Sequence, residues 1–333
     1  MWIVHTRLGR VWMSAWTLFQ IVQIQIRRGG PPKWMQKEVS AFAPEAILTI
    51  GVAASWMGAA ALARKAKIPL YLIVHDEGHY NYFWITVLRD FGTRLFGKAY
   101  KQARTRFCIS EPMAQLYQQR FGVDGTVMLP LRSRQSLFFK EPKKKEVESE
   151  QSKKIIYAGS IYGKGFEELD KLAQALSRHD IKLIAYTPSN FNASQVEYLE
   201  VRNALPSDEL IQVLHKEADA LLLWTAFAEE ARENVRTLFP SKMVDYTATG
   251  VPIVVVAPED SCISRYLKDN RDAGYLITDS CPQKNAEQIT KLLKDASELE
   301  RLGKGAIAAG FKDFSFEKNF QKFCSKLNFD NDS

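Results

Sequence analysis

Short apolar runs alternate with helical patterns along the first part of the chain. The runs predict buried strands, and the segments between them carry apolar residues at the spacing of amphipathic helices. Strands are predicted at residues 46–50, 70–75, 106–110 and 126–129, and helices at 53–67, 86–103 and 111–121. An alternation of strands and helices along the chain is typical of a parallel sheet with helices on both faces.

The same alternation starts again near residue 155. Strands are predicted at 155–158, 182–186, 220–223, 252–256 and 274–277, and helices at 165–177, 207–216, 242–249 and 316–327. Ser207 is expected to cap the helix that it opens. The predicted fold class is therefore α/β, with two Rossmann-like doubly wound domains that face each other across a cleft.

A charged stretch with few core residues separates these two halves. Three lysines at 143–145 are followed by Glu146, Glu148 and Glu150, a composition typical of a solvated linker. The predicted boundaries are 1–138 for an acceptor-side domain, 139–153 for the linker, 154–310 for a second domain and 311–333 for a terminal helix that packs back towards the first domain. Ligands of parallel sheets bind beyond the carboxyl ends of the strands, so functional side chains are expected there.

Charge narrows the choice of partners. The 333 residues carry a net charge of +7, which favours nucleotide diphosphates, anionic membrane surfaces or nucleic acid. No basic and aromatic nucleic-acid motif is present, so nucleic acid is not expected as a partner. Four widely spaced cysteines indicate a reducing compartment rather than a disulfide frame. His75 and His79 have no further ligands nearby, and no metal site is expected.

The N-terminal segment 11–26 is apolar but contains three glutamines and lacks a cleavage site. It is too short and too polar to span a bilayer. A packed helix is the favoured interpretation, and a helix on a membrane surface through Trp12, Trp16 and Phe19 is the alternative. The expected location is cytoplasmic, with peripheral contact at the inner membrane face as the alternative.

The most informative segment is 239–255, Phe-Pro-Ser-Lys-Met-Val-Asp-Tyr-Thr-Ala-Thr-Gly-Val-Pro-Ile-Val-Val. A loop enters a predicted helix at Ser241, and free N–H groups at a helix start attract phosphate. Lys242 adds a positive charge there. Asp245, one turn later, could accept hydrogen bonds from vicinal ribose hydroxyls. The other interpretation is an ordinary helix–strand joint with Lys242 and Asp245 in solvent.

A second loop follows the strand that ends at residue 158. It contains Gly159, Ser160, Lys164 and Gly165. Glycines let the backbone approach a phosphate, and Lys164 would neutralise its charge. Tight turns also use glycine, so this loop alone is weak support for a phosphate site.

Residues 240–255 resemble the signature of the family 4 glycosyltransferases, and residues 157–165 are similar to the Gly-Arg…Lys-Gly loop of that family. The resemblance implies the GT-B fold and a nucleoside-diphosphate-sugar donor. Asp245 holds the place of the glutamate that contacts the donor ribose. An earlier family glutamate, which contacts the donor sugar, would fall at Thr237, and Glu233 and Asn234 are the candidates to replace it.

The resemblance extends to two further places. A loop that holds the nucleotide base in the family corresponds to Arg202 and Asn203, which could equally be surface residues. His75, followed by Asp76, comes directly after a predicted buried strand, where the family commonly carries a histidine. These side chains could bind a sugar hydroxyl or assist proton transfer. His79 is the alternative, and a structural histidine bonded to backbone is the competing interpretation.

The resemblance implies transfer of a hexosyl or related sugar with retention of configuration and without an obligatory metal or cofactor. The acceptor is expected to be a glycan, a lipid-linked sugar or a small molecule in polysaccharide or glycolipid biosynthesis. The first domain lacks the glycine-rich loop of the family and is expected to be abridged. The alternative function is a catalytically silent nucleotide-sugar-binding partner of a glycan synthase complex.

Overall fold

The computed structural model describes residues 33–52, 55–76, 86–143, 152–190 and 196–327. The chain forms two compact units, one of residues 1–129 with 322–333 and one of residues 130–321. The predicted segment 11–26, with Trp12, Trp16 and Phe19, lies outside the described residues. No helix in the described ranges has the length and hydropathy needed to cross a membrane.

The first unit contains a parallel sheet in the order β1-β2-β3-β4. Its strands are β1 Ile47–Ile50, β2 Leu70–Val74, β3 Thr105–Cys108 and β4 Thr126–Val127, and its helices are α2 Lys33–Phe42, α3 Ser55–Ala66, α4 Thr86–Gln102 and α5 Glu111–Phe121. The predicted strands and helices of this half are therefore present, with ends that differ by a few residues.

Aromatic side chains fill the core between α3, α4 and α5. Phe96 is fully buried and its ring lies 5.2 Å from that of Trp56 and 5.9 Å from that of Tyr117, measured between centroids. Helix α5 begins at Ser110, whose hydroxyl caps the helix by accepting a hydrogen bond of 3.1 Å from the Met113 amide. It ends at Gly122, whose φ of 72° favours glycine.

The second unit contains a parallel six-stranded sheet in the order β10-β9-β8-β5-β6-β7. Its strands are β5 Lys153–Ala158, β6 Ile181–Thr187, β7 Glu200–Asn203, β8 Ala220–Trp224, β9 Ile253–Val256 and β10 Tyr275–Ile277. Its helices are α6 Gly165–Ser177, α7 Ser207–Glu217, α8 Arg232–Thr237, α9 Lys242–Tyr246, α10 Cys262–Asp269, α11 Pro282–Lys294 and α12 Ala296–Asp313.

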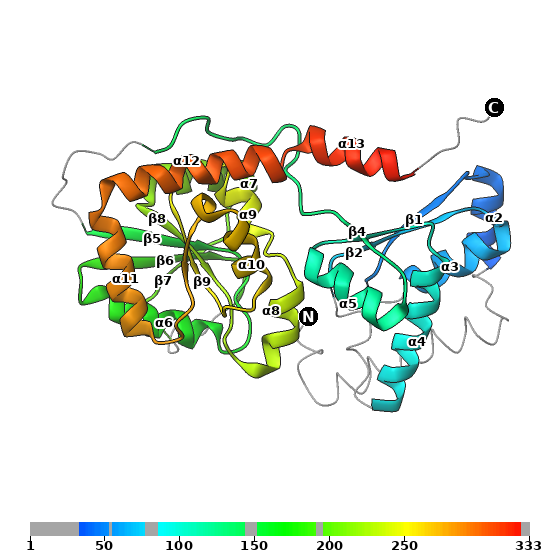
Figure 1. Ribbon diagram of the computed structural model, residues 1–333, viewed down its shortest axis with the longest axis horizontal. Helices are drawn as coiled ribbons and strands as arrows, with labels where there is room; N and C mark the ends of the chain where they lie inside the picture. The colour runs from blue at the N-terminus through cyan, green and yellow to red at the C-terminus, as the bar shows by residue number, and fades with distance from the viewer. Residues whose placement is uncertain (1–32, 53–54, 77–85, 144–151, 191–195, 328–333) are drawn as a thin grey trace. The chain divides into compact units, whose positions relative to one another are not determined.

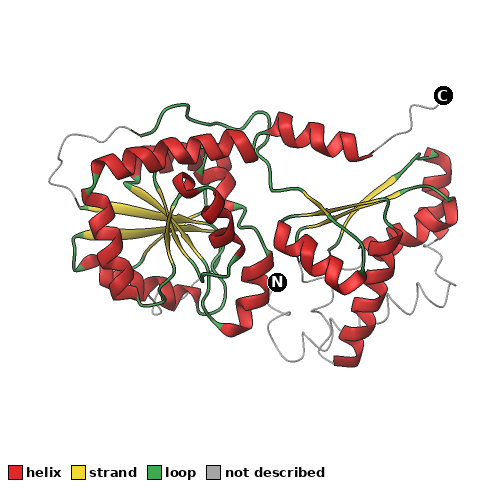
Figure 2. Ribbon diagram, in the orientation of Figure 1, coloured by secondary structure: helices red, strands yellow, loops and turns green. Residues whose placement is uncertain are grey.

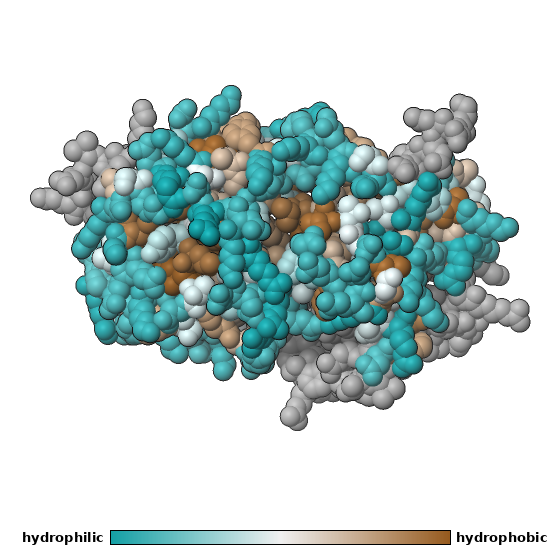
Figure 3. Space-filling model, viewed as in Figure 1, coloured by the Kyte–Doolittle hydropathy of each residue, from teal (hydrophilic) through white to brown (hydrophobic). Residues whose placement is uncertain are grey.

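Helices cover both faces of this sheet (Figure 2). Helices α6 and α11 pack against each other on one face (Figure 1), where their leucines and isoleucines meet Leu222 and Val254 of the sheet. Burial of such side chains is the main favourable term in the stability of the unit. On the face drawn in Figure 3, hydrophilic side chains cover most of this unit, with separate apolar patches between them.

The last helix, α13 Phe316–Leu327, begins in the second unit and ends in the first. In the first unit, the Phe323 ring lies 5.0 Å from the Phe107 ring, and the Thr105 hydroxyl donates a hydrogen bond of 2.8 Å to the Lys326 carbonyl. The half-buried Phe323 of α13 thus packs beside β3.

The segment 130–143, which we call the strap, belongs to the second unit. The Phe139 amide donates to the Ala248 carbonyl at 2.8 Å and the Lys143 amide donates to the Gly250 carbonyl at 2.9 Å. The Phe139 ring stacks on His215 with 3.6 Å between ring centroids. Residues 139–143, assigned by composition to a linker, therefore lie against the second unit because their backbone and apolar groups have partners there.

Three local expectations differ from the structure. Ser207 does not cap α7: Pro206 stands at the cap position without a side-chain bond, and Ser207 is the first helical residue. Helix α9 ends at Tyr246, earlier than the predicted residue 249, and is followed by turns. The segment around Arg202, predicted as a loop, forms the edge strand β7.

Candidate functional site

Tyr246 of α9 connects the 239–255 segment to the start of the Gly159 loop, the two segments that carry the sequence motifs. Its hydroxyl accepts a hydrogen bond of 2.7 Å from the Ala158 amide, at the end of β5, and donates one of 3.1 Å to the Leu222 carbonyl of β8. The side chain is buried, and burial raises the pKa of its hydroxyl. Tyr246 thus fixes α9 beside the carboxyl ends of β5 and β8, where ligands of parallel sheets bind.

Lys242 packs directly over Gly159. Gly159 has φ of 135°, and a Cβ at this position would collide with the Lys242 side chain. The backbone conformation favours glycine at this position, and a larger residue would also displace the end of the Lys242 side chain. The Lys242 ammonium lies 5.0 Å from the centroid of the Tyr157 ring, a cation–π distance. The structure therefore brings together Gly159 of one motif and Lys242 of the other.

Burial lowers the pKa of Lys242, and no carboxylate among the described residues offsets that burial. A desolvated ammonium without a counterion is unfavourable until an anion pairs with it. Helix α9 has only 5 residues, so its dipole is weaker than the predicted longer helix would supply. The Lys242 ammonium, more than the helix start at Ser241, is thus the cationic element here.

The remaining residues of the Gly159 loop have different roles. Gly165 is the first residue of α6 and is buried, and a Cβ there would lie 2.9 Å from Ile161 Cγ2. Its lack of a side chain therefore serves packing. The Ser160 carbonyl accepts a hydrogen bond of 2.8 Å from the Tyr157 hydroxyl. Lys164 is exposed at the start of α6 and makes no side-chain cap bond there.

Asp245 of α9 lies beside the start of α7. The Ser207 hydroxyl of α7 lies 3.4 Å from Asp245 Oδ1. Burial raises the pKa of Asp245, and the Ser207 hydrogen bond and the Arg132 charge both act to lower it. Arg132 was not predicted from the sequence, because a single arginine after a strand has no recognisable pattern.

Arg202 and Asn203 lie at the edge of the sheet. The Arg202 guanidinium is 2.6 Å from Glu200 and 3.0 Å from Glu217, and it donates to the Tyr186 hydroxyl at 2.7 Å. These partners occupy much of its hydrogen-bonding capacity. Asn203 is the last residue of β7 and is exposed.

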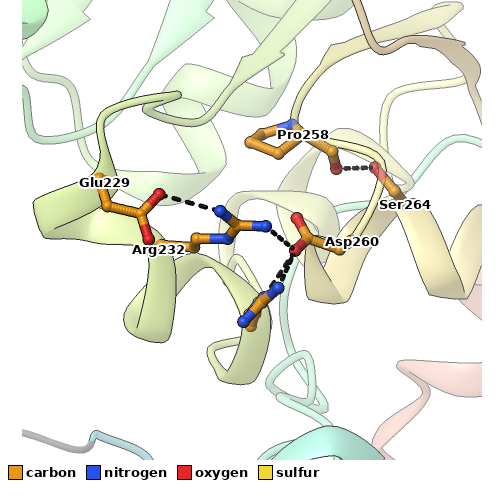
Figure 4. Close-up of polar contacts among 6 residues, drawn as sticks. Glu229, Arg232, Pro258, Asp260 and Ser264 are labelled. Carbon is orange, nitrogen blue, oxygen red and sulfur yellow. Dashed lines mark hydrogen bonds and ion pairs between the residues drawn. The ribbon is translucent and has the colours of Figure 1, made fainter.

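An ion-pair cluster ties α8 to the loop after β9 (Figure 4). Asp260 lies 2.5 Å from Arg236 and 3.2 Å from Arg232, and Arg232 in turn lies 2.9 Å from Glu229. In the same view the Ser264 hydroxyl donates to the Pro258 carbonyl at 2.8 Å and shapes the start of α10. The cluster holds α8 at the carboxyl edge of β8 and β9.

Helix α8 carries the residues next to the missing family glutamate. Thr237 is buried, and its hydroxyl donates a hydrogen bond of 2.8 Å to the Glu233 carbonyl, so it serves the helix. Glu233 and Asn234 are exposed on the same short helix.

In the first unit, His75 and Asp76 follow β2 directly and are exposed. They stand at the carboxyl end of a central strand of the sheet, as predicted for ligand-contacting residues. His79 lies outside the described residues. Within the described ranges, no group of three or more His, Cys, Asp or Glu side chains is placed to hold a metal ion.

Comparison with known proteins gives a family match over part of the chain and a fold. The family model described as Glycosyltransferase Family 4 matches residues 21–129. No curated protein matches this sequence.

Solved structures share the fold at low sequence identity. HepE from Anabaena, solved in complex with UDP-glucose, has a TM-score of 0.62 and 15% identity, covering 86% of this chain and 79% of its own. Sucrose-phosphate synthase from Thermosynechococcus elongatus has a TM-score of 0.61 and 12% identity, covering 88% of this chain and 75% of its own. Trehalose 6-phosphate synthase from Burkholderia multivorans has a TM-score of 0.59 and 10% identity, covering 87% of this chain and 72% of its own. The family match and this fold identify the chain as a glycosyltransferase of the GT-B fold that is similar to family 4.

Proposed function

We propose that this glycosyltransferase takes its sugar from a nucleoside-diphosphate-sugar held by the second unit and transfers it to a glycan, lipid-linked or small-molecule acceptor. The observation that supports the donor class best is the Lys242 ammonium, desolvated over Gly159 without a carboxylate partner among the described residues. A diphosphate is the anion that such a charge beside a glycine backbone suits.

The roles we propose for the other residues follow from their places. Asp245, one turn after Lys242, would accept hydrogen bonds from the ribose hydroxyls, and Asn203, at the end of β7, would lie towards the base. Glu233 on α8 would contact the donor sugar in place of the family glutamate. The ion pairs of Asp260 support this last role, since they hold α8 at the sheet edge.

Chemically, the charge that grows during transfer is that of the departing diphosphate. Lys242 and the exposed Lys164 would stabilise it, and this stabilisation is the largest contribution that we assign to the protein. The proposed reaction retains the anomeric configuration and has no obligatory metal or cofactor. His75 and Asp76 of the first unit are proposed to contact the reacting sugar or its acceptor.

Thermal unfolding with UDP-, GDP- and ADP-sugars tests the donor class, because a ligand that binds the folded state raises Tm. UDP-glucose is the first probe, since HepE was solved with it. Gly159→Ala should abolish the stabilisation by the matched donor. Gly163→Asn is the control: its φ of 56° suits asparagine, and a Cβ there meets open space. Equal stabilisation of the wild type and Gly159→Ala would refute the proposed seat.

A catalytically silent nucleotide-sugar-binding partner is the second candidate. It is favoured by Thr237, which is buried and bonded within α8 where the family carries a sugar-contacting glutamate. The two candidates separate on turnover: the enzyme releases nucleoside diphosphate from its matched donor when cell-extract acceptor is added, and the silent partner binds the donor without releasing it.

A further inference from the structure

The positive charge of the chain is concentrated in the first unit. By sequence, that unit has 18 lysines and arginines against nine aspartates and glutamates, a net charge of +9. The second unit has 27 against 29, a net charge of −2. The donor diphosphate that we assign to the second unit therefore does not account for the basic balance of the chain, and the excess points to an anionic partner of the first unit.

Seven exposed cations of the first unit lie where its helices end and its parallel strands begin. The strands start side by side, and the Ile47 amide at the start of β1 donates to the Pro69 carbonyl before β2 at 2.9 Å. The end of α13 joins this edge through the hydrogen bond from Thr105 of β3 to the Lys326 carbonyl. We call these cations the basic edge: Arg64, Lys65, Lys67, Lys101, Arg104, Arg120 and Lys326. The connections that carry them contain two carboxylates, Glu45 and Asp124.

The opposite edge of the same sheet has the reverse charge pattern. The segments 51–54, 75–85, 109–110 and 128–129, which follow the four strands, contain no lysine or arginine in the sequence. His75 and Asp76 lie in one of them, and Glu111 opens the helix after another. The two ends of parallel strands are at opposite edges of a sheet, so the cations lie away from the residues that we propose for the acceptor. The basic edge therefore needs a partner other than an acceptor bound at His75.

Exposed aromatic side chains accompany these cations. Phe42, the last residue of α2, is 81% exposed, and Trp34, two turns earlier, is 66% exposed. Helix α2 lies beside α3, because Lys65 of the basic edge donates a hydrogen bond to the Gln36 side chain. Phe42 comes shortly before β1 in the chain and therefore lies at the same edge. A helix dipole favours cations in the last turn of a helix, but it gives no reason for exposed aromatic rings beside them.

We propose that the basic edge, together with Phe42 and Trp34, docks the first unit on an anionic membrane surface. Lipid phosphates would pair with the cations, and the aromatic rings would enter the boundary between headgroups and acyl chains. RNA is the other anionic polymer to test, but no basic and aromatic nucleic-acid motif is present. The surface consists of described residues, is separate from the segment 11–26, and does not depend on the proposed function.

Binding to vesicles tests this surface. The full chain should co-sediment with vesicles of equal parts phosphatidylcholine and phosphatidylglycerol, more weakly with phosphatidylcholine alone, and less as salt is added. A triple variant, Lys67→Gln with Lys101→Gln and Lys326→Gln, should lose about 100-fold in affinity at low salt, because each lysine near an anionic surface contributes about fivefold.

The control removes the same charge from the second unit. Lys171→Gln with Lys182→Gln and Lys291→Gln changes three exposed lysines, and this triple variant should bind vesicles within about twofold of the wild type. An equal loss in both triple variants would mean that binding follows net charge alone, and it would overturn the proposal.

The aromatic part of the surface is tested separately. Phe42→Ser should weaken vesicle binding about tenfold and leave its salt dependence unchanged, because insertion of the ring is apolar. Tyr198→Ser, at a 40% exposed aromatic of the second unit, is the matched control and should bind as the wild type does. Unchanged binding by Phe42→Ser would overturn the role of the ring.

Three further results would overturn the proposal. A wild type that does not bind anionic vesicles at low salt has no such surface. Binding that the basic-edge variants retain belongs elsewhere on the chain. Binding to single-stranded RNA, lost in the basic-edge variant, without binding to vesicles would make the partner a nucleic acid. If the triple variant does not fold, its three single variants replace it, with an expected loss of about fivefold each. A chain that docks on vesicles but binds no nucleoside diphosphate refutes the proposed function alone.

Discussion

The two units present their candidate residues in different ways. In the second unit, the partly buried Lys242 lies against Gly159 and Tyr157, and the partly buried Asp245 lies beside the Ser207 hydroxyl. In the first unit, His75 and Asp76 stand exposed at the end of β2. A desolvated charge packed against backbone, as at Lys242 and Gly159, is compatible with few functions. Exposed polar residues at a strand end, such as His75 and Asp76, are compatible with many. The second unit therefore carries the more specific of the two candidate sites.

The largest effect is expected at His75, in the first unit. His75→Ala should lower turnover by about 100-fold, as loss of a contact to the reacting sugar does, while leaving nucleoside-diphosphate affinity within about threefold. The measurement is diphosphate release from the matched donor. His179→Ala, an exposed histidine beyond α6, is the control and should keep wild-type turnover. If His75→Ala also kept it, the first unit would contribute no catalytic group at this strand end.

An intermediate effect is expected at Lys242. Lys242→Met should weaken diphosphate binding by about 1.5–3 kcal/mol, on the order of 10- to 100-fold, because it removes a charge-assisted contact. Lys164→Met, at an exposed position, should cost less. Calorimetry on both variants tests the order, and a larger loss at Lys164 would move the phosphate seat to the start of α6.

The same Lys242→Met variant should be more stable than the wild type in the absence of nucleotide. Burial lowers the pKa of Lys242 in the folded state, so the charged form costs stability below that pKa, and the cost is relieved as pH rises through it towards the unfolded value. Thermal unfolding should therefore give a higher Tm at pH 7, with a difference that shrinks in alkaline buffer. A lower Tm at pH 7 would show that the ammonium is already neutralised within the protein.

The smallest effect is expected at Arg202. Its guanidinium is held by Glu200 and Glu217, so Arg202→Met should change nucleotide affinity less than about threefold and cost at most about 1 kcal/mol of stability. Asn203→Ala, at the exposed end of β7, is the companion variant. Calorimetry with nucleoside diphosphates of different bases would identify Arg202 as a base contact if its loss changed the preference among them.

The sequence predicted those features that depend on local pattern. Helices α5 and α6 have the predicted ends, because a capping serine and a glycine start mark them. Lys242 lies over Gly159, and the sequence analysis assigns both the Lys242 segment and the Gly159 loop to phosphate binding. Arg132 and the Ser207–Asp245 contact could not be predicted, since each joins segments far apart in the chain by a single side chain. Strand β7 was missed because Glu200 and Asn203 are polar and exposed, as edge positions can be.

The strap has a consequence for exchanging halves between related glycosyltransferases. A recombination point chosen from composition, at residues 139–153, would leave Arg132 with the first half and face Val244 and Thr247, its hydrogen-bond partners, with a foreign segment. The hydrogen bonds from Phe139 to Ala248 and from Lys143 to Gly250 would then hold a strap whose earlier part no longer matched the helix beneath it. A junction at Leu129 and Pro130 keeps these partners together, and a chimera that carries the terminal helix must still divide α13 between its parents.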